Sequence, residues 1–172
     1  MIFGDPDKFA ILFDIVEEWN DDLSLWKNGV FFIYVDGIII PSTLNTFELR
    51  TTLAVFNTLE ADMFYGNKIY LPKNDLIEMI RGYSVGCDEP FDKNYFIELL
   101  NKRVIWEISG CELEDQKYFV FVIKDSISES IVWSDPQAGF HEKTLPIGTV
   151  GYIAKNIQDF LAANEFLTTR KK

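Results

Sequence analysis

The sequence predicts an α+β fold, in which an antiparallel or mixed β-sheet carries helices packed mainly on one face. Segments with strand-like alternation cluster towards both ends of the chain, and segments with helical periodicity lie between and after them. The 172 residues suit one domain, and a hydrophobic content of 48% supplies an ample core. We therefore expect a single domain over residues 1–172, without an internal repeat or a linker.

The opening third predicts a β-meander. Residues 9–16 place alternate apolar side chains on one continuous face, and residues 30–35 form a second apolar strand. Asp36-Gly37 is the strongest hairpin signal in the sequence, and it leads into a third strand at residues 38–40. The Gly4-Asp5-Pro6 segment is expected to form an Asx-type turn that launches the first strand.

Helices are expected in the middle of the chain and at its end. Asn45, followed three residues later by Glu48, predicts a capping box, and an apolar face continues from there to residue 59. A second helix begins at Pro72, and Asp92 is the expected N-cap of a third. A last helix is expected over residues 149–165.

Three further strands are expected before the last helix. They cover residues 104–108, 118–123 and 130–134. An acidic segment, residues 110–116, lies between the first two of these strands, and we expect it to be a hairpin tip. Trp106 and Trp133 fall inside strands and are expected in the core.

The charge balance restricts the classes of partner. The chain has 27 acidic and 16 basic side chains, for a net charge of −11. Direct binding to nucleic acid needs clustered lysine and arginine, and anionic membranes repel an acidic surface, so neither partner is expected. A basic protein or a cation is favoured instead. His141 is the single histidine, which excludes multi-histidine metal sites; no metal and no cofactor is predicted.

Cysteine usage and the first residues favour the cytoplasm. Cys87 and Cys111 are 24 positions apart and form no CxxC motif, so two reduced thiols are expected. Asp5 and Asp7 stand where a signal peptide carries positive charge, and no apolar run approaches the length of a membrane span.

The opening residues resemble the immunity protein 42 family of bacterial polymorphic or contact-dependent toxin systems. The resemblance rests on Met1-Ile2-Phe3-Gly4-Asp5-Pro6, on Phe9-Ala10-Ile11 and on Trp26-Lys27-Asn28-Gly29-Val30-Phe31-Phe32-Ile33-Tyr34-Val35-Asp36-Gly37. It covers roughly the first 40 residues, and length and acidity agree beyond them. The resemblance implies a stoichiometric inhibitor that binds the C-terminal domain of one cognate toxin, with no catalytic residues. An acidic inhibitor suits a basic nuclease domain, because opposite charge accelerates association.

Two acidic segments are the candidate partner-binding residues. The first is an acidic loop that also carries tryptophan, which is enriched at interface hot spots; a solvated loop is the competing interpretation. The second is the acidic hairpin tip, for which an ordinary polar turn is the alternative. The candidate residues are Glu17, Glu18, Trp19, Asp21, Asp22, Glu112, Glu114 and Asp115.

Two other functional classes stay open. A small acidic hydrolase would use paired carboxylates as acid and base. An adaptor domain would bind another basic protein through the same acidic surface. His141 has no serine or cysteine nucleophile beside it in sequence, and we do not expect it to be catalytic. The short chain, with a single histidine and without a glycine-rich phosphate loop, favours a protein that is not an enzyme.

Overall fold

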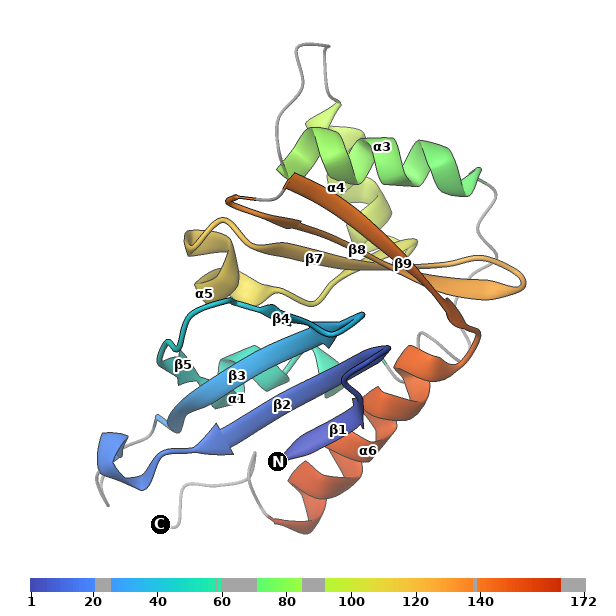
Figure 1. The fold of residues 1–172 in the computed structure, drawn as a ribbon. Coiled ribbons are helices and arrows are strands. Elements are labelled where there is room, and N and C mark those ends of the chain that lie inside the picture. Colours follow the sequence, from blue (N-terminus) through green and yellow to red (C-terminus); the bar gives the residue numbers. More distant parts are fainter. Residues whose placement is uncertain (21–25, 58, 60–70, 85–91, 138, 165–172) are drawn as a thin grey trace. The chain divides into compact units, whose positions relative to one another are not determined.

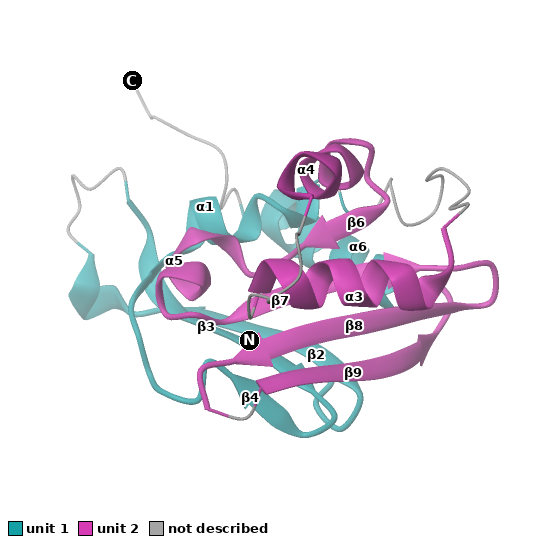
Figure 2. Cartoon of the chain, turned by 90° about the horizontal axis from the view of Figure 1, so that it is seen from above, with its two compact units in different colours: residues 1–60, 150–172 teal, residues 61–149 magenta. Residues whose placement is uncertain are grey.

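The computed structural model describes residues 1–20, 26–57, 59, 71–84, 92–137 and 139–164 (Figure 1). The chain divides into two compact units, coloured separately in Figure 2: residues 1–60 with 150–172 form unit 1, and residues 61–149 form unit 2. The α+β class is confirmed, with the described strands arranged as two antiparallel sheets where one sheet was expected. Our expectation that the whole chain behaves as a single domain stays a prediction.

Unit 1 holds the first sheet, in the order β1-β2-β3-β4, with β5 also paired to β3. Its strands are β1 Ile2–Asp5, β2 Phe9–Ile15, β3 Asn28–Val35, β4 Ile38–Ile40 and β5 Phe47–Glu48. The helical elements of unit 1 whose bounds the structure describes are η1 Glu17–Trp19, α1 Leu49–Leu53 and α6 Thr149–Ala163, whose first residue is assigned to unit 2. The β-meander expected for the opening third is therefore present, and β1 precedes it.

The β2–β3 register gives the first sheet two faces of different character. Phe13 pairs with Phe31 and Ile11 with Ile33, so their side chains lie on one side, which we call the closed face. Six residues of β2 and β3 on this face are buried: Phe9, Ile11, Phe13, Phe31, Ile33 and Val35. The opposite side, the open face, carries Ile2, Gly4, Ala10, Leu12, Asp14, Asn28, Val30, Phe32, Tyr34, Ile39 and Glu48, of which Ala10 is buried.

Aromatic contacts attach the helices to the closed face. Phe160 of α6 lies 5.7 Å from Phe3 and 6.0 Å from Phe13, measured between ring centroids. Phe47, immediately before α1, lies 5.7 Å from Phe31. These rings stabilise the packing on this side, because each removes a large apolar area from water. The helices of unit 1 thus lie on one face of the sheet, as expected.

The hairpin and the first helix show one confirmed prediction and one that is wrong. Asp36 and Gly37 have φ angles of 55° and 78°, the left-handed pair that a two-residue type I′ turn requires. The expected cap of the first helix is wrong, because Glu48 is its N-cap. The Glu48 carboxylate accepts hydrogen bonds from the backbone amides of Arg50 and Thr51, whereas the Asn45 amide donates to Thr43.

Unit 2 holds the second sheet, in the order β6-β7-β8-β9. Its strands are β6 Ile105–Glu107, β7 Phe119–Lys124, β8 Ser128–Asp135 and β9 Gly139–Pro146. Its described helices are α3 Lys73–Ser84, α4 Lys93–Asn101 and α5 Gly110–Asp115. The Asp92 side chain accepts a hydrogen bond from the Tyr95 amide, which confirms the predicted N-cap of α4. Trp106 and Trp133 are buried, as expected.

The core of unit 2 joins α3 and α4 to one face of the second sheet. Tyr83 of α3 stacks on Phe96 of α4 at 4.6 Å between ring centroids, and both approach Phe121 of β7 edge-on. The buried core residues are Leu76, Ile77, Ile80, Phe96, Leu99, Ile105, Phe121, Ile123 and Val132.

The structure corrects three predictions about local elements. The acidic segment at residues 110–116 is not a hairpin tip, because residues 110–115 form the helix α5. The three strands expected before the last helix are joined by a fourth, because residues 139–146, for which no element was expected, pair with β8 as the strand β9. The first residues form the edge strand β1 ahead of the turn at Asp5, whose side chain accepts a hydrogen bond from the Asp7 amide as expected.

Candidate functional site

The first candidate segment is partly ordered as a helical turn. Glu17 and Glu18 are exposed, and Trp19 leaves 37% of its surface accessible to solvent. These three residues form the 3₁₀ turn η1, where a loop was expected. Asp21 and Asp22, from the same prediction, lie outside the described residues. The described part of this segment therefore presents two carboxylates and an indole ring at the surface of unit 1.

A pair of asparagines attaches η1 to the sheet. The Asn20 amide nitrogen donates to the carbonyl oxygens of Val16 at 2.7 Å and Asn28 at 2.8 Å. The backbone amide of Asn28 donates to the Asn20 side-chain oxygen at 2.7 Å, and the Asn28 side chain donates to the carbonyl oxygen of Trp19 at 3.0 Å. Because these bonds join the end of β2 to the start of β3, η1 is held on a rigid support.

A second network supports the same end of the sheet. The Glu48 carboxylate accepts hydrogen bonds from the backbone amides of Lys27 at 3.1 Å and Thr51 at 2.7 Å, and from the Thr51 hydroxyl at 2.6 Å. Burial raises the pKa of Glu48, but these hydrogen bonds to the charged form outweigh it and hold the pKa below its usual value. Glu48 thus has a structural role that its acidity alone does not reveal.

The second candidate segment, α5, directs one of its carboxylates inward. Glu112 and Glu114 are half-buried and Asp115 is exposed. The carboxyl group of Glu114 is hydrogen-bonded to that of Glu107 on β6, and the Ser109 hydroxyl donates to Glu107 Oε1 at 2.9 Å. Only part of the predicted anionic cluster therefore faces solvent.

Burial and the neighbouring Glu114 carboxylate raise the pKa of Glu107 to about 7. Burial, helped by Glu107 and Glu114, also raises the pKa of Tyr83 on α3. Glu107 was not singled out from the sequence, although its position two residues after the apolar Ile105 is the pattern that places both side chains on one face of a strand.

The two candidate segments belong to different units, η1 to unit 1 and α5 to unit 2. The prediction that both segments bind one partner thus stays a prediction. Each segment has its own support: the asparagine pair beneath η1, and the Glu107–Glu114 carboxyl pair beneath α5.

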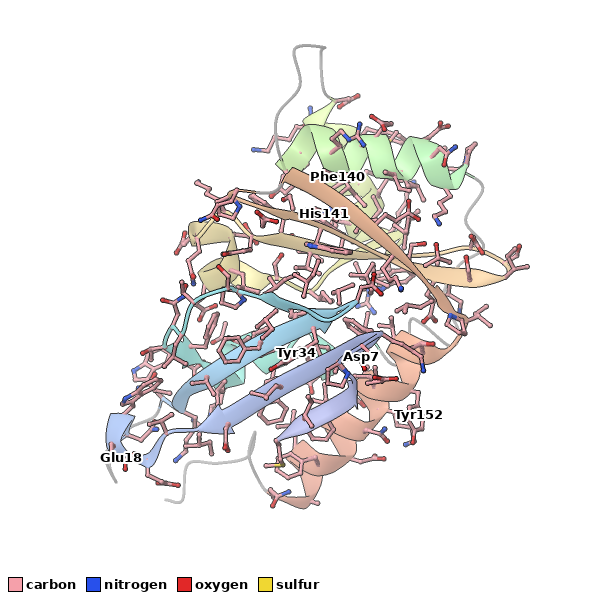
Figure 3. The ribbon with its side chains drawn as sticks, viewed as in Figure 1. Asp7, Glu18, Tyr34, Phe140, His141 and Tyr152 are labelled. Carbon is pink, nitrogen blue, oxygen red and sulfur yellow. The ribbon has the colours of Figure 1, made fainter. Side chains whose placement is uncertain are left out.

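The single histidine lies against a tryptophan. The rings of His141 on β9 and Trp133 on β8 stack with their centroids 5.1 Å apart, and His141 Nε2 is 3.4 Å from Asp135 Oδ2 (Figure 3). Cys111 is a free, exposed thiol, while Cys87 lies outside the described residues.

Two general features of the described chain bear on its chemistry. Among the described residues, histidine, cysteine and carboxylate side chains form no cluster of three or more that could hold a metal ion. Within the same part of the chain, every helix is too short or too polar to span a membrane.

The sequence reasoning missed the open face of the first sheet. Leu12, Val30, Phe32 and Tyr34 are half-buried, and Ile2 and Ile39 at the two edges are exposed. A sequence signal for it exists: Phe32 and Tyr34 are aromatic at the alternate positions of β3, where a solvated antiparallel sheet normally carries polar side chains.

Comparisons with known proteins agree on one class. The sequence profile of the family described as "Immunity protein 42" matches residues 1–160. A solved structure, the crystal structure of CdiI from Burkholderia dolosa AUO158, superposes with a TM-score of 0.61. The two sequences are 19% identical, and the superposition covers 93% of this chain and 99% of the CdiI chain. The likeness therefore shows a shared fold. No curated protein sequence matches the chain. Because the profile extends over nearly the whole sequence, this chain belongs to the immunity protein 42 family.

Proposed function

We propose that this chain is a bacterial immunity protein that binds a cognate toxin domain and neutralises it by stoichiometric blocking. The family match over residues 1–160 carries the proposal. The shared fold with a CdiI protein supports a role in contact-dependent growth inhibition or a related polymorphic toxin system. An inhibitor of this kind acts by binding and needs no catalytic residues, so we propose that the chain is not an enzyme.

Charge supports a basic toxin domain, of which a nuclease is the natural example. The net charge of −11 attracts a positively charged partner over distances of about the Debye length, roughly 8 Å at physiological salt. Such attraction raises association rates by orders of magnitude at low salt. Nuclease active sites must hold phosphates, so their surfaces are basic, and an acidic inhibitor occupies them by complementary charge. Acting inside the cell that produces the toxin requires a cytoplasmic protein, which we propose for this chain.

We propose that η1 supplies part of the binding surface. Its exposed Glu17 and Glu18 are supported by the Asn20–Asn28 hydrogen bonds, so little flexibility is lost on binding. Trp19 adds the type of large, amphipathic side chain that dominates interface energetics. Asp21 and Asp22, Glu112, Glu114 and Asp115 stay in the proposal as further acidic contacts.

The paired-carboxylate alternative has a concrete candidate in Glu107 and Glu114, and its geometry disfavours hydrolysis. Glycosidases separate their two carboxyl groups by about 5–9.5 Å so that a sugar or a water lies between them. The Glu107 and Glu114 carboxyl groups hydrogen-bond to one another directly. They are therefore better suited to supporting α5 than to attacking a substrate.

Co-expression with the toxin domain encoded immediately upstream tests the proposed function. We expect a 1:1 complex on size-exclusion chromatography and survival of cells that express the toxin domain together with this chain. A non-cognate toxin domain is the control, because immunity requires a specific partner. Absence of both complex and protection would refute the proposal.

Charge reversal tests the contribution of the acidic segments. Three double variants are informative: Glu17→Lys with Glu18→Lys, Asp21→Lys with Asp22→Lys, and Glu114→Lys with Asp115→Lys. Exposed charges at an interface rim mainly change the association rate, so we expect stopped-flow rates to fall several-fold and to depend less on salt. Wild-type rates in all three variants would place the contact elsewhere.

A further inference from the structure

The open face of the first sheet is the largest unexplained feature of unit 1. Its residues form cross-strand rows: Ile2, Leu12 and Phe32 make one row, and Gly4, the buried Ala10, Tyr34 and Ile39 make the next. Neighbouring side chains within such rows have Cβ atoms about 4.5–5.5 Å apart, so they form a continuous apolar surface. α1 and α6 pack on the closed face, where Phe47 and Phe160 contact Phe31 and Phe13.

Exposure on this face is unusual for residues of this type. Ile39 leaves 43% of its surface accessible and Ile2 leaves 46%. Between them, Leu12, Phe32 and Tyr34 are half-buried, and Figure 3 labels Tyr34 on β3. Solvated faces of antiparallel sheets normally alternate to polar residues, and contiguous apolar patches on soluble proteins mark sites of association.

The charge on and beside this face selects the partner. Asp14 and Glu48 are the charged residues of the open face, and both are acidic. Asp14 pairs in register with Val30, and its side chain is 64% exposed. Its carboxylate lies 4.0 Å from the amino group of Met1. Glu17 and Glu18 of η1 follow directly at the end of β2, and Figure 3 places Glu18 and Tyr34 towards opposite ends of the β2–β3 pair. None of the open-face residues is lysine or arginine.

We propose that the open face is the docking surface for the cognate toxin domain, with its apolar rows as the centre and Asp14 and η1 as the acidic rim. The occupant is a basic protein surface that places apolar side chains against Phe32 and Tyr34 and lysine or arginine against Asp14. An apolar centre with a polar rim is the usual anatomy of a protein interface.

A second copy of this chain is the competing occupant of the open face. The negative charge of the chain disfavours this self-association. Pairing two open faces would bring together two chains of net charge −11, each with Asp14 and η1 at the contact. Like charges opposed across an interface are strongly unfavourable. An anionic lipid surface is disfavoured for the same reason.

This inference rests on the proposed function, and matched variants test it separately. Ile39→Lys and Ile97→Lys change isoleucines of similar exposure, 43% on the open face and 41% on α4 of unit 2. Asp14→Lys and Asp159→Lys reverse carboxylates that are each 64% exposed, on the open face and on α6. The probe is the toxin domain encoded upstream, and the measurement is its dissociation constant by isothermal titration.

We expect Ile39→Lys and Asp14→Lys each to weaken binding by about tenfold or more, while both control variants stay within about threefold of wild type. Tyr34→Ala removes an aromatic from the centre and is expected to weaken binding by about 30-fold. Thermal melts of every variant ensure that a change in affinity is not a loss of fold.

Three outcomes separate the two proposals. If the wild-type chain neither binds the toxin domain nor protects cells, the proposed function fails and the docking surface fails with it. If wild type binds and the open-face variants bind equally well, the toxin uses another surface, and the function stands. A concentration-dependent dimer of the free chain that Ile39→Lys abolishes would assign the open face to self-association and overturn the inference.

Discussion

The strands β3 and β8 are both eight residues long and both lie between two neighbours, yet they are buried in opposite ways. β3 alternates, with Phe31, Ile33 and Val35 buried and Phe32 and Tyr34 half-buried. In β8, residues 129–134 are all buried, although they include a glutamate and two serines. The strand with the more polar sequence is thus the more deeply buried, and aromatic side chains are left partly accessible in unit 1. Hydrophobicity alone does not determine whether a residue is buried, and the partly accessible aromatic residues lie on the surface where we propose that a partner binds.

Truncating two adjacent phenylalanines of β3 tests most directly whether the two faces of the first sheet differ in burial. We expect Phe31→Ala to cost about 3–5 kcal/mol of unfolding free energy, because it leaves a cavity beneath the helices. Phe32→Ala, on the open face, should cost less, about 1–2 kcal/mol, because that ring is only partly buried. Urea denaturation of both variants gives the two values. Equal losses would show that the two faces are equally packed.

The buried carboxyl pair of unit 2 makes stability depend on pH. Glu107 titrates at 4.5 when unfolded and at about 7 when folded, so the native state holds an extra proton between those values. Stability is then greatest below pH 4.5 for this group, falls as the pH rises to about 7, and is level above it. The total is up to about 3 kcal/mol.

Glu107→Gln should remove that decline, because glutamine keeps the hydrogen-bonding shape without ionising. Urea unfolding at pH 5 and pH 8 compares the variant with wild type, and Glu18→Gln on the exposed η1 serves as the control. A Glu107→Gln protein that loses as much stability as wild type between the two pH values would contradict the assignment.

The polar residues inside β8 supply the next test. Glu129 is fully buried, and one of its carboxylate oxygens accepts a hydrogen bond from the Gly148 amide at 2.8 Å. Glu129→Ala deprives that amide of this acceptor and should cost about 1–3 kcal/mol, measured by thermal or urea denaturation. The exposed Glu18→Ala should change stability by less than about 0.5 kcal/mol. A neutral Glu129→Ala would mean that water replaces the lost carboxylate.

The smallest effect is expected at the histidine. His141→Ala removes a ring stacked on Trp133 and should cost about 0.5–1.5 kcal/mol of stability. Protection against the toxin should be unchanged, because the proposed inhibition uses no acid–base chemistry. A toxin-challenge assay on the folded variant measures this, and lost protection would give His141 a functional role.

The sequence predicted the helices, strands and turns that have a clear local pattern. β2, β3, α3 and α6 have long, clear apolar periodicity, and the Asp36-Gly37 turn has the required backbone angles. β9 was missed because residues 141–144 are His-Glu-Lys-Thr, which lack the apolar alternation of a half-buried strand. α5 was missed because it is six residues long and rich in acids, a composition equally typical of a turn.

Local sequence patterns do not show which strands pair with one another or which neighbours a side chain faces. Which strands share a sheet depends on contacts distant in sequence, so one sheet was expected where two exist. For the candidate site, the acidity and aromatic character of Glu17, Glu18 and Trp19 were readable, and their exposure is confirmed. The inward orientation of Glu114 towards Glu107 was not, because a charge in a sequence carries no information about which neighbour it meets.

The two parts of unit 1 are far apart in the chain, and this sets when the protein can protect. Phe160 packs against Phe3 and Phe13, so the closed face is completed by a helix made almost last. A ribosome adding about 5–20 residues per second needs roughly 5–20 s to synthesise the intervening unit 2. Nascent chains therefore expose an unfinished apolar sheet throughout that interval, and we expect a fragment that stops before α6 to give the cell no protection. Protection comes from completed molecules, so a stock of finished protein must exist before the toxin arrives.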